Sequence, residues 1–60
     1  MFVREMQAKA EGHLAGLQVP EAPVNAELIL AYVLECRRPE VRAQAGRALT
    51  PKQERHIWNL

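Results

Sequence analysis

An uninterrupted apolar run near the middle of the chain restricts its fold more than any other feature. Residues 28–34 read Leu-Ile-Leu-Ala-Tyr-Val-Leu in a chain of 60 residues. A segment that is apolar on every side is normally buried, either as a helix or as a short strand. Residues 25–27 before the run are typical of a helix start, and Pro23 suits a first helical position. We therefore predict a central helix over residues 23–35, shielded by the rest of the chain.

The segment before this run has the clearest helical periodicity. At 100° per residue, one stripe of about 120° collects most of its apolar residues together with one histidine. These residues are Phe2, Val3, Met6, Ala10, His13, Leu14 and Leu17. Gly16 and Pro20 are expected to end the helix, and Gly12 weakens its middle by about 1 kcal/mol. The two prolines at positions 20 and 23 predict an extended connector.

Two shorter helices are expected after the apolar run. The first covers residues 39–45, begins at Pro39 and stops at Gly46, which is a natural C-terminal residue. Val41 is its only large apolar side chain.

The second covers residues 51–60. Thr50, Pro51 and Gln53 form a capping box with proline in the first helical position. Ile57 and Leu60 are its expected core contacts. With no alternating β-branched pattern elsewhere, the chain is predicted to be all-α, a small compact bundle of about four helices with segments near 2–17, 23–35, 39–45 and 51–60.

Composition excludes several classes of function. The chain is long enough for one small domain, residues 1–60, whose core is marginal because nine residues are Ala and only 5% are aromatic. There is one Cys and no Ser or Asp, which excludes a disulfide framework, a serine nucleophile and Asp-based metal sites. No apolar stretch reaches membrane-spanning length, and the start of the chain lacks a signal-peptide pattern. We expect a cytoplasmic protein with no membrane partner.

The residues that could carry chemistry are scattered. Cys36, His13 and His56 are the possible soft metal ligands, but they lie on three different segments without the close pairs that zinc prefers. Cys36 lacks an evident oxyanion site for nucleophilic catalysis. Three carboxylates, Glu5, Glu11 and Glu27, are interpreted as solvated surface charges. We predict no catalytic, cofactor-binding or metal-binding residue in this chain.

Charge is distributed unevenly along the chain. Residues 1–35 carry two basic against five acidic side chains, a net of −3, and residues 36–60 carry six against two, a net of +4. The basic residues of the second part are Arg37, Arg38, Arg42, Arg47, Lys52 and Arg55. They are interpreted either as ordinary solvated surface or as a cationic face that meets an acidic protein or a phosphate backbone. Arg37, Arg38, Arg42 and Arg47 are the predicted partner-facing residues.

Two motifs resemble a specific family. Residues 23–34, Pro-Val-Asn-Ala-Glu-Leu-Ile-Leu-Ala-Tyr-Val-Leu, are similar to the second-helix signature of peptide chain release factor glutamine methyltransferases, and residues 47–51, Arg-Ala-Leu-Thr-Pro, are similar to the motif that opens a later helix in that family. The resemblance covers residues 14–60. Asn25 stands where Asp is usual, Tyr32 replaces a common His, and residues 41–43 replace a mostly aliphatic run.

The resemblance implies a helical N-terminal domain that helps to dock the release factor beside a methyltransferase domain. That second domain uses S-adenosylmethionine and carries a Gly-rich loop and an Asn-Pro-Pro-Tyr motif, neither of which occurs in residues 1–60. The catalytic domain is therefore expected to be absent from this chain, which would bind no S-adenosylmethionine and transfer no methyl group by itself. The expected partners are a release factor, active in translation termination, and a cognate methyltransferase domain.

Two other interpretations stay open. The first is a small helical module that binds nucleic acid, although the net charge of +1 makes this the weaker alternative. Its affinity would fall steeply with salt. The second is a structural remnant without activity of its own.

Overall fold

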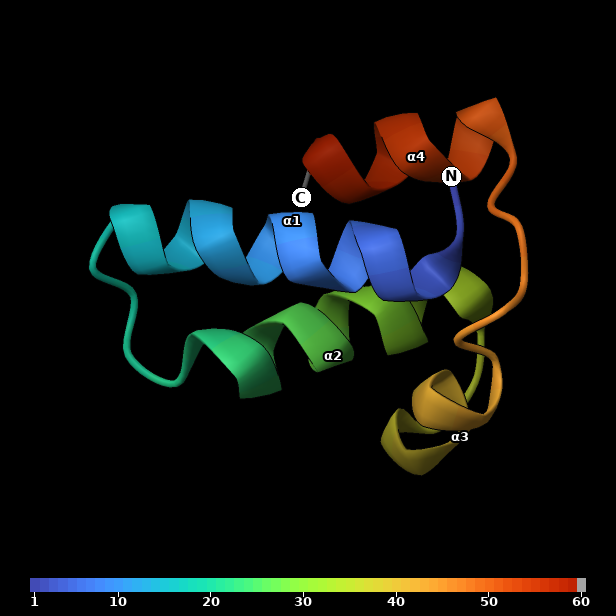
Figure 1. Ribbon diagram of the computed structural model, residues 1–60, viewed down its shortest axis with the longest axis horizontal. Helices are drawn as coiled ribbons and strands as arrows, with labels where there is room; N and C mark the ends of the chain where they lie inside the picture. The colour runs from blue at the N-terminus through green and yellow to red at the C-terminus, as the bar shows by residue number, and fades with distance from the viewer. Residues whose placement is uncertain (60) are drawn as a thin grey trace.

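Four helices make up the part of the chain that the structure describes, residues 1–59 (Figure 1). In this computed structural model α1 spans Val3–Gly16, α2 Ala22–Leu34, α3 Arg38–Ala43 and α4 Pro51–Trp58. The only extended pairing among the described residues is an isolated antiparallel bridge between Phe2 and Ala48. The all-α prediction is confirmed, and the helix bounds differ from those expected by at most two residues. The expected core contact Leu60 lies outside the described residues.

Helix α2 is the element on which the other helices pack. It lies against α1, α3 and α4, and α1 runs antiparallel beside it (Figure 1). Its buried residues form two adjacent stripes. The first contains Ala22, Ala26, Leu30 and Val33, and the second contains Glu27, Ala31 and Leu34. Leu30 is fully buried. The central position predicted for this segment is therefore confirmed.

The expectation that α2 is covered on every side is wrong. Leu28 is 49% and Tyr32 66% exposed, and both lie on a third stripe that ends at the exposed Glu35. A central helix needs neighbours all around it to be fully covered. The described residues supply three, of which α3 has six residues and α4 eight. Leu28 and Tyr32 therefore remain accessible to solvent although both are large hydrophobic residues.

The apolar stripe predicted on α1 is buried over only part of its length. Val3, Met6 and Ala10 are buried, whereas Phe2 is 42% and Leu17 63% exposed. Towards its C-terminal end, α1 borders a small groove that Ile29 of α2 and Ile57 and Trp58 of α4 also line. The stripe thus contributes to the core in its first half and to an apolar surface in its second half.

The chain reverses after α1 and after α2 at residues other than glycine. Gly16 is the last residue of α1, as predicted, but the left-handed residue that reverses the chain is Gln18, with φ 60°. Glu35, with φ 56°, does the same after α2, and the Cys36 N–H donates to the Ala31 carbonyl at 3.0 Å. Both are Schellman-type turns built without glycine. Gly46 has no positive φ and lies in a turn after α3, which ends at Ala43.

The connector between α1 and α2 is a tight turn, so the expectation of an extended segment is wrong. Gln18 and Glu21 both adopt left-handed conformations there. The side chain of Asn25 donates to the carbonyls of Pro20 at 2.8 Å and Glu21 at 3.3 Å. Asn25 therefore acts as a donor towards the turn, which an ionised Asp at this position could not do.

The loop between α3 and α4 forms backbone hydrogen bonds with the start of α1. The N–H groups of Val3 and Arg4 donate to the carbonyls of Arg47 at 2.9 Å and Ala45 at 3.1 Å, and Leu49 N–H donates to the Met1 carbonyl at 2.8 Å. The first N–H groups of a helix have no partner within it, so these carbonyls satisfy donors that would otherwise need water. The N-terminal residues are thereby joined to the loop that precedes α4.

The predicted capping box of α4 is confirmed. Gln53 N–H donates to Thr50 Oγ1 at 3.1 Å, and Thr50 N–H donates to Gln53 Oε1 at 2.9 Å. Pro51 follows as the first helical residue. The cap orients α4 so that Ile57, 4% exposed, reaches the core as expected.

Replacing one leucine of α2 at a time distinguishes its buried stripe from its exposed one. Leu30→Ala is expected to cost about 2–5 kcal/mol because it leaves a cavity in the core. Leu28→Ala, the same change on the exposed stripe, is expected to stay within about 1 kcal/mol. Urea denaturation followed by circular dichroism measures both. Equal losses would contradict the central position of Leu30.

A second substitution tests the weak middle of α1. Gly12 is exposed within the helix, and an added Cβ would meet no atom within 4 Å. Gly12→Ala should therefore stabilise the domain by about 1 kcal/mol, which raises the melting temperature by roughly 4–8 °C. Ala8→Gly, at another exposed position of α1, should lower it by a similar amount. An unchanged melting temperature for both variants would show that α1 does not limit stability.

Candidate functional site

The most distinctive polar feature of the described chain is a buried carboxylate between two arginines. The side chain of Glu27, on α2, is only 6% exposed. Its Oε1 lies 3.6 Å from Nε of Arg38, and its Oε2 lies 3.5 Å from Nη2 of Arg42, both on α3. Each oxygen thus faces a different guanidinium. We call these three residues the arginine clamp.

The expectation that Glu27 is a solvated surface charge is wrong. Glu27 belongs to the second buried stripe of α2, one turn before Ala31, and this stripe faces α3. A buried carboxylate needs charged or hydrogen-bonding partners because burial removes its hydration. The tertiary packing supplies them by bringing Arg38 and Arg42 over it. Glu5 is exposed, as expected, whereas Glu11 is partly buried.

The clamp leaves most of each guanidinium accessible. The side chain of Arg38 is 44% exposed and that of Arg42 is 76% exposed. A guanidinium has five N–H donors, and each arginine uses one nitrogen towards Glu27. Two positive charges over one negative charge leave a net charge of +1 at this surface. The arrangement can therefore bind a further carboxylate or phosphate group.

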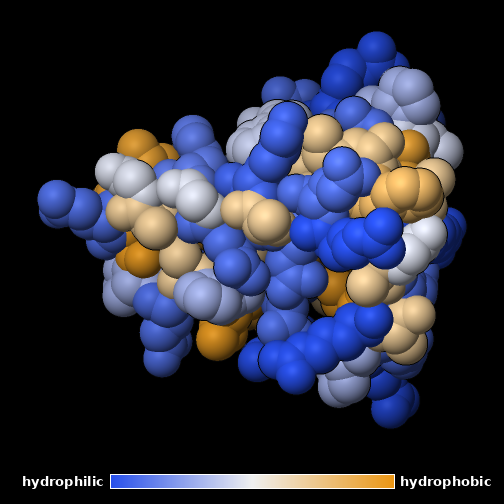
Figure 2. Space-filling view, viewed as in Figure 1, coloured by the Kyte–Doolittle hydropathy of each residue, from blue (hydrophilic) through white to orange (hydrophobic). Residues whose placement is uncertain are grey.

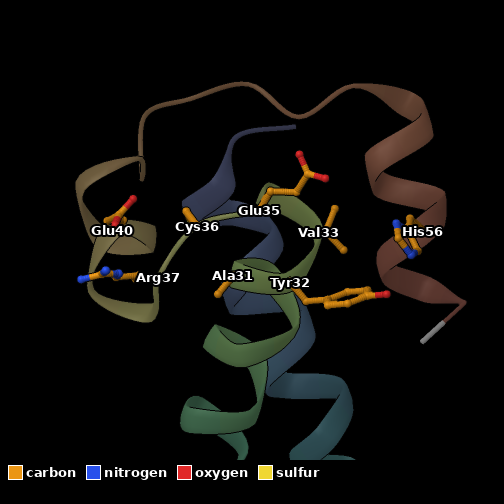
Figure 3. Close-up of a pocket in the computed structure, with 8 residues that line it drawn as sticks. All are labelled: Ala31, Tyr32, Val33, Glu35, Cys36, Arg37, Glu40 and His56. Carbon is orange, nitrogen blue, oxygen red and sulfur yellow. The ribbon is translucent and has the colours of Figure 1, made fainter.

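Arg37 belongs to a different surface. It lines an open cleft of about 700 Å³ together with Glu35, Glu40, Tyr32, Cys36, His56, Ala31 and Val33 (Figure 3). Glu40 lies on α3, Arg37 directly precedes this helix and His56 lies on α4, with α2 between α3 and α4 (Figure 3). Two carboxylates accompany the one guanidinium in this cleft, so it is not a basic site. Arg37 is therefore separated from Arg38 and Arg42, which line another surface with Glu27.

The fourth predicted arginine, Arg47, lies in the loop after α3. Its Nη1 donates to Oε1 of Gln44 at 2.7 Å, and its backbone carbonyl accepts from the start of α1. Lys52 and Arg55 are exposed on α4. Of the four residues predicted to face a partner, the structure brings together only Arg38 and Arg42. On the face shown in Figure 2, hydrophilic side chains are spread over the whole molecule, with apolar patches between them.

The candidate soft ligands lie apart. His13 packs edge-on against Trp58, with ring centroids 5.5 Å apart, and His56 packs in the same way against Tyr32 at 5.7 Å. Cys36 is a partly buried free thiol. Within residues 1–59, no group of three His, Cys, Asp or Glu side chains is placed to share a metal ion. His13 is more exposed than the half-buried packing residue that the stripe predicts.

Part of the clamp could have been predicted from the spacing of its residues in the sequence. Arg38 and Arg42 are four residues apart, so any helix through residues 39–45 extended by one residue places them on one face. Glu27 directly follows Ala26 of the first buried stripe and directly precedes the apolar run of residues 28–34. What the sequence does not give is the packing angle of α3, which decides that this face lies over Glu27.

The fold is that of a small all-α domain whose distinctive chemistry is on its surface. None of the helices in residues 1–59 combines the length and the apolar character of a membrane span.

Comparison with known families then gives a specific assignment. The model of the PrmC N-terminal domain matches residues 5–60. The chain belongs to this family, the N-terminal domain of the release factor glutamine methyltransferases. Neither the curated proteins nor the solved structures that were compared with the chain gave a match.

The clamp predicts that removing the two arginines destabilises the domain more than removing the carboxylate does. Arg38→Met with Arg42→Met leaves Glu27 buried without a counter-charge and should cost on the order of 3 kcal/mol. Glu27→Gln leaves two arginines that are already hydrated and should cost about 1 kcal/mol or less. Urea denaturation of both variants measures the difference. A double arginine variant as stable as Glu27→Gln would show that the carboxylate is not dependent on its partners.

Proposed function

We propose that this chain is a substrate-docking domain: it binds a peptide chain release factor and presents it to the methyltransferase domain that modifies a release factor glutamine. The catalytic domain supplies S-adenosylmethionine and the methyl-transfer chemistry, and residues 1–60 supply recognition. The setting is the cytoplasm, where translation termination takes place. Under this proposal the isolated chain has no transferase activity.

The arginine clamp is the observation that supports the docking role most directly. It lies within residues 5–60, which match the family model, and its two arginines are accessible at the surface. Arginines held in a fixed arrangement recognise carboxylates with defined geometry, and arginine is enriched at protein interfaces. Arg38 and Arg42 are therefore the proposed contact residues. Arg37 instead lines a separate cleft, and Arg47 is paired with Gln44.

A binding experiment tests this proposal. Arg38→Gln with Arg42→Gln removes two charges but keeps N–H donors near Glu27, so the carboxylate is not stranded. We expect the affinity of the 60-residue chain for purified release factor to fall about tenfold or more, because charged contacts at an interface are lost. Titration calorimetry measures the affinity, and circular dichroism checks that the variant is folded.

Lys52→Gln with Arg55→Gln is the matched control. It removes the same charge from α4 and should leave the affinity nearly unchanged. Equal losses in both variants would mean that only net charge matters, and no loss in either would contradict the assigned surface. Salt-dependent binding of the unaltered chain to RNA, without binding to the release factor, would favour the nucleic-acid alternative.

A further inference from the structure

We propose that Glu27 is the positioning residue of the docking surface: its buried carboxylate fixes Arg38 and Arg42 so that their outward N–H groups bind an acidic segment of the partner. This inference rests on the docking role proposed above. It specifies that the bound segment of the partner carries carboxylates. It also identifies Glu27 as a residue that affects partner binding only through the two arginines.

The geometry of the clamp supports this role. Glu27 Oε1 lies 3.6 Å from Nε of Arg38, whose side chain is 44% exposed and whose two terminal Nη groups carry the other four N–H donors. Glu27 Oε2 faces Nη2 of Arg42, whose side chain is 76% exposed. A planar guanidinium binds a carboxylate through two parallel N–H donors. Each arginine of the clamp can therefore contact Glu27 and a partner carboxylate at the same time.

The stability of α3 depends on few contacts. It has six residues, and only Val41 is buried. Helices of this length are not stable without tertiary contacts, because nucleation is unfavourable. The two ion pairs to Glu27 join α3 to α2 beside Val41. Glu27 thus orders both the helix and the arginines that it carries.

Charge alone gives the opposite expectation. Glu27 is negative and would repel an acidic partner, so its neutralisation should strengthen binding if only the total charge counted. Positioning predicts weaker binding instead, because mobile arginines lose rotamer freedom when they bind. The sign of the change on removing Glu27 therefore separates the two explanations.

The test compares Glu27→Gln with Glu40→Gln. Glu40 is exposed on α3, so both variants gain one unit of charge within the same part of the molecule. We expect Glu27→Gln to raise the Kd for purified release factor about tenfold, a coupling typical of residues in one ion-pair network. Glu40→Gln should leave the Kd unchanged or lower it. Circular dichroism confirms that both variants are folded at the measuring temperature.

A double-mutant cycle shows whether Glu27 acts through the arginines. In the Arg38→Gln, Arg42→Gln background, Glu27→Gln should have no further effect on the Kd. A purely structural contribution would lower binding in both backgrounds and would overturn the proposal.

Hydrogen exchange gives a readout that does not depend on the partner. The Gln44 and Ala45 amides donate to Glu40 and Arg42 carbonyls at 3.1 and 3.2 Å. They should exchange about tenfold faster in Glu27→Gln, whereas α1 amides should not change, because local opening is confined to weakly held segments.

The outcomes separate this inference from the docking role. If the unaltered chain does not bind the release factor, both the docking role and the acidic partner are wrong. If the unaltered chain binds and Glu27→Gln binds equally well, the positioning role of Glu27 is wrong and the docking role stands. Weaker binding of Glu27→Gln than of Glu40→Gln, lost in the double-arginine background, supports the inference.

Discussion

The burial of α2 is the constraint on which the rest of this structure depends. Its two buried stripes provide the surface against which α1, α3 and α4 pack, and Leu30 in the first stripe is fully buried. Apolar burial is the dominant favourable contribution to folding, and a chain of 60 residues has little of it. The N-terminal end of the chain is held by backbone hydrogen bonds between residues 45–49 and the start of α1.

The same helix also explains the polar surface. Its second buried stripe contains Glu27, and a carboxylate in that position must be compensated by charge. Arg38 and Arg42 compensate it and are themselves held in place, although both remain accessible. The buried carboxylate of the core and the proposed recognition surface therefore involve the same three residues. The domain has few large side chains, so few other residues could hold α3 against α2.

Several features followed from the sequence because their causes are local. The capping box at Thr50 and Gln53 depends on residues three positions apart, and the central helix depends on a continuous apolar run. The connector between α1 and α2 did not follow, because the left-handed conformations of Gln18 and Glu21 are imposed on residues that do not prefer them. The exposure of Leu28 and Tyr32 depends on how many neighbours surround α2. Burial of Glu27 was missed for a similar reason: charge at one position says nothing about what packs over it.

The sequence by itself determined the helical class, the central position of residues 23–35 and the family, because propensity, caps and motif spacing are encoded in neighbouring residues. Only the tertiary structure decided which arginines act together. It placed Arg38 and Arg42 over Glu27 and Arg37 in a separate cleft beside Glu35 and Glu40. That division follows from the packing of α3 against α2, which depends on contacts between residues distant in the chain.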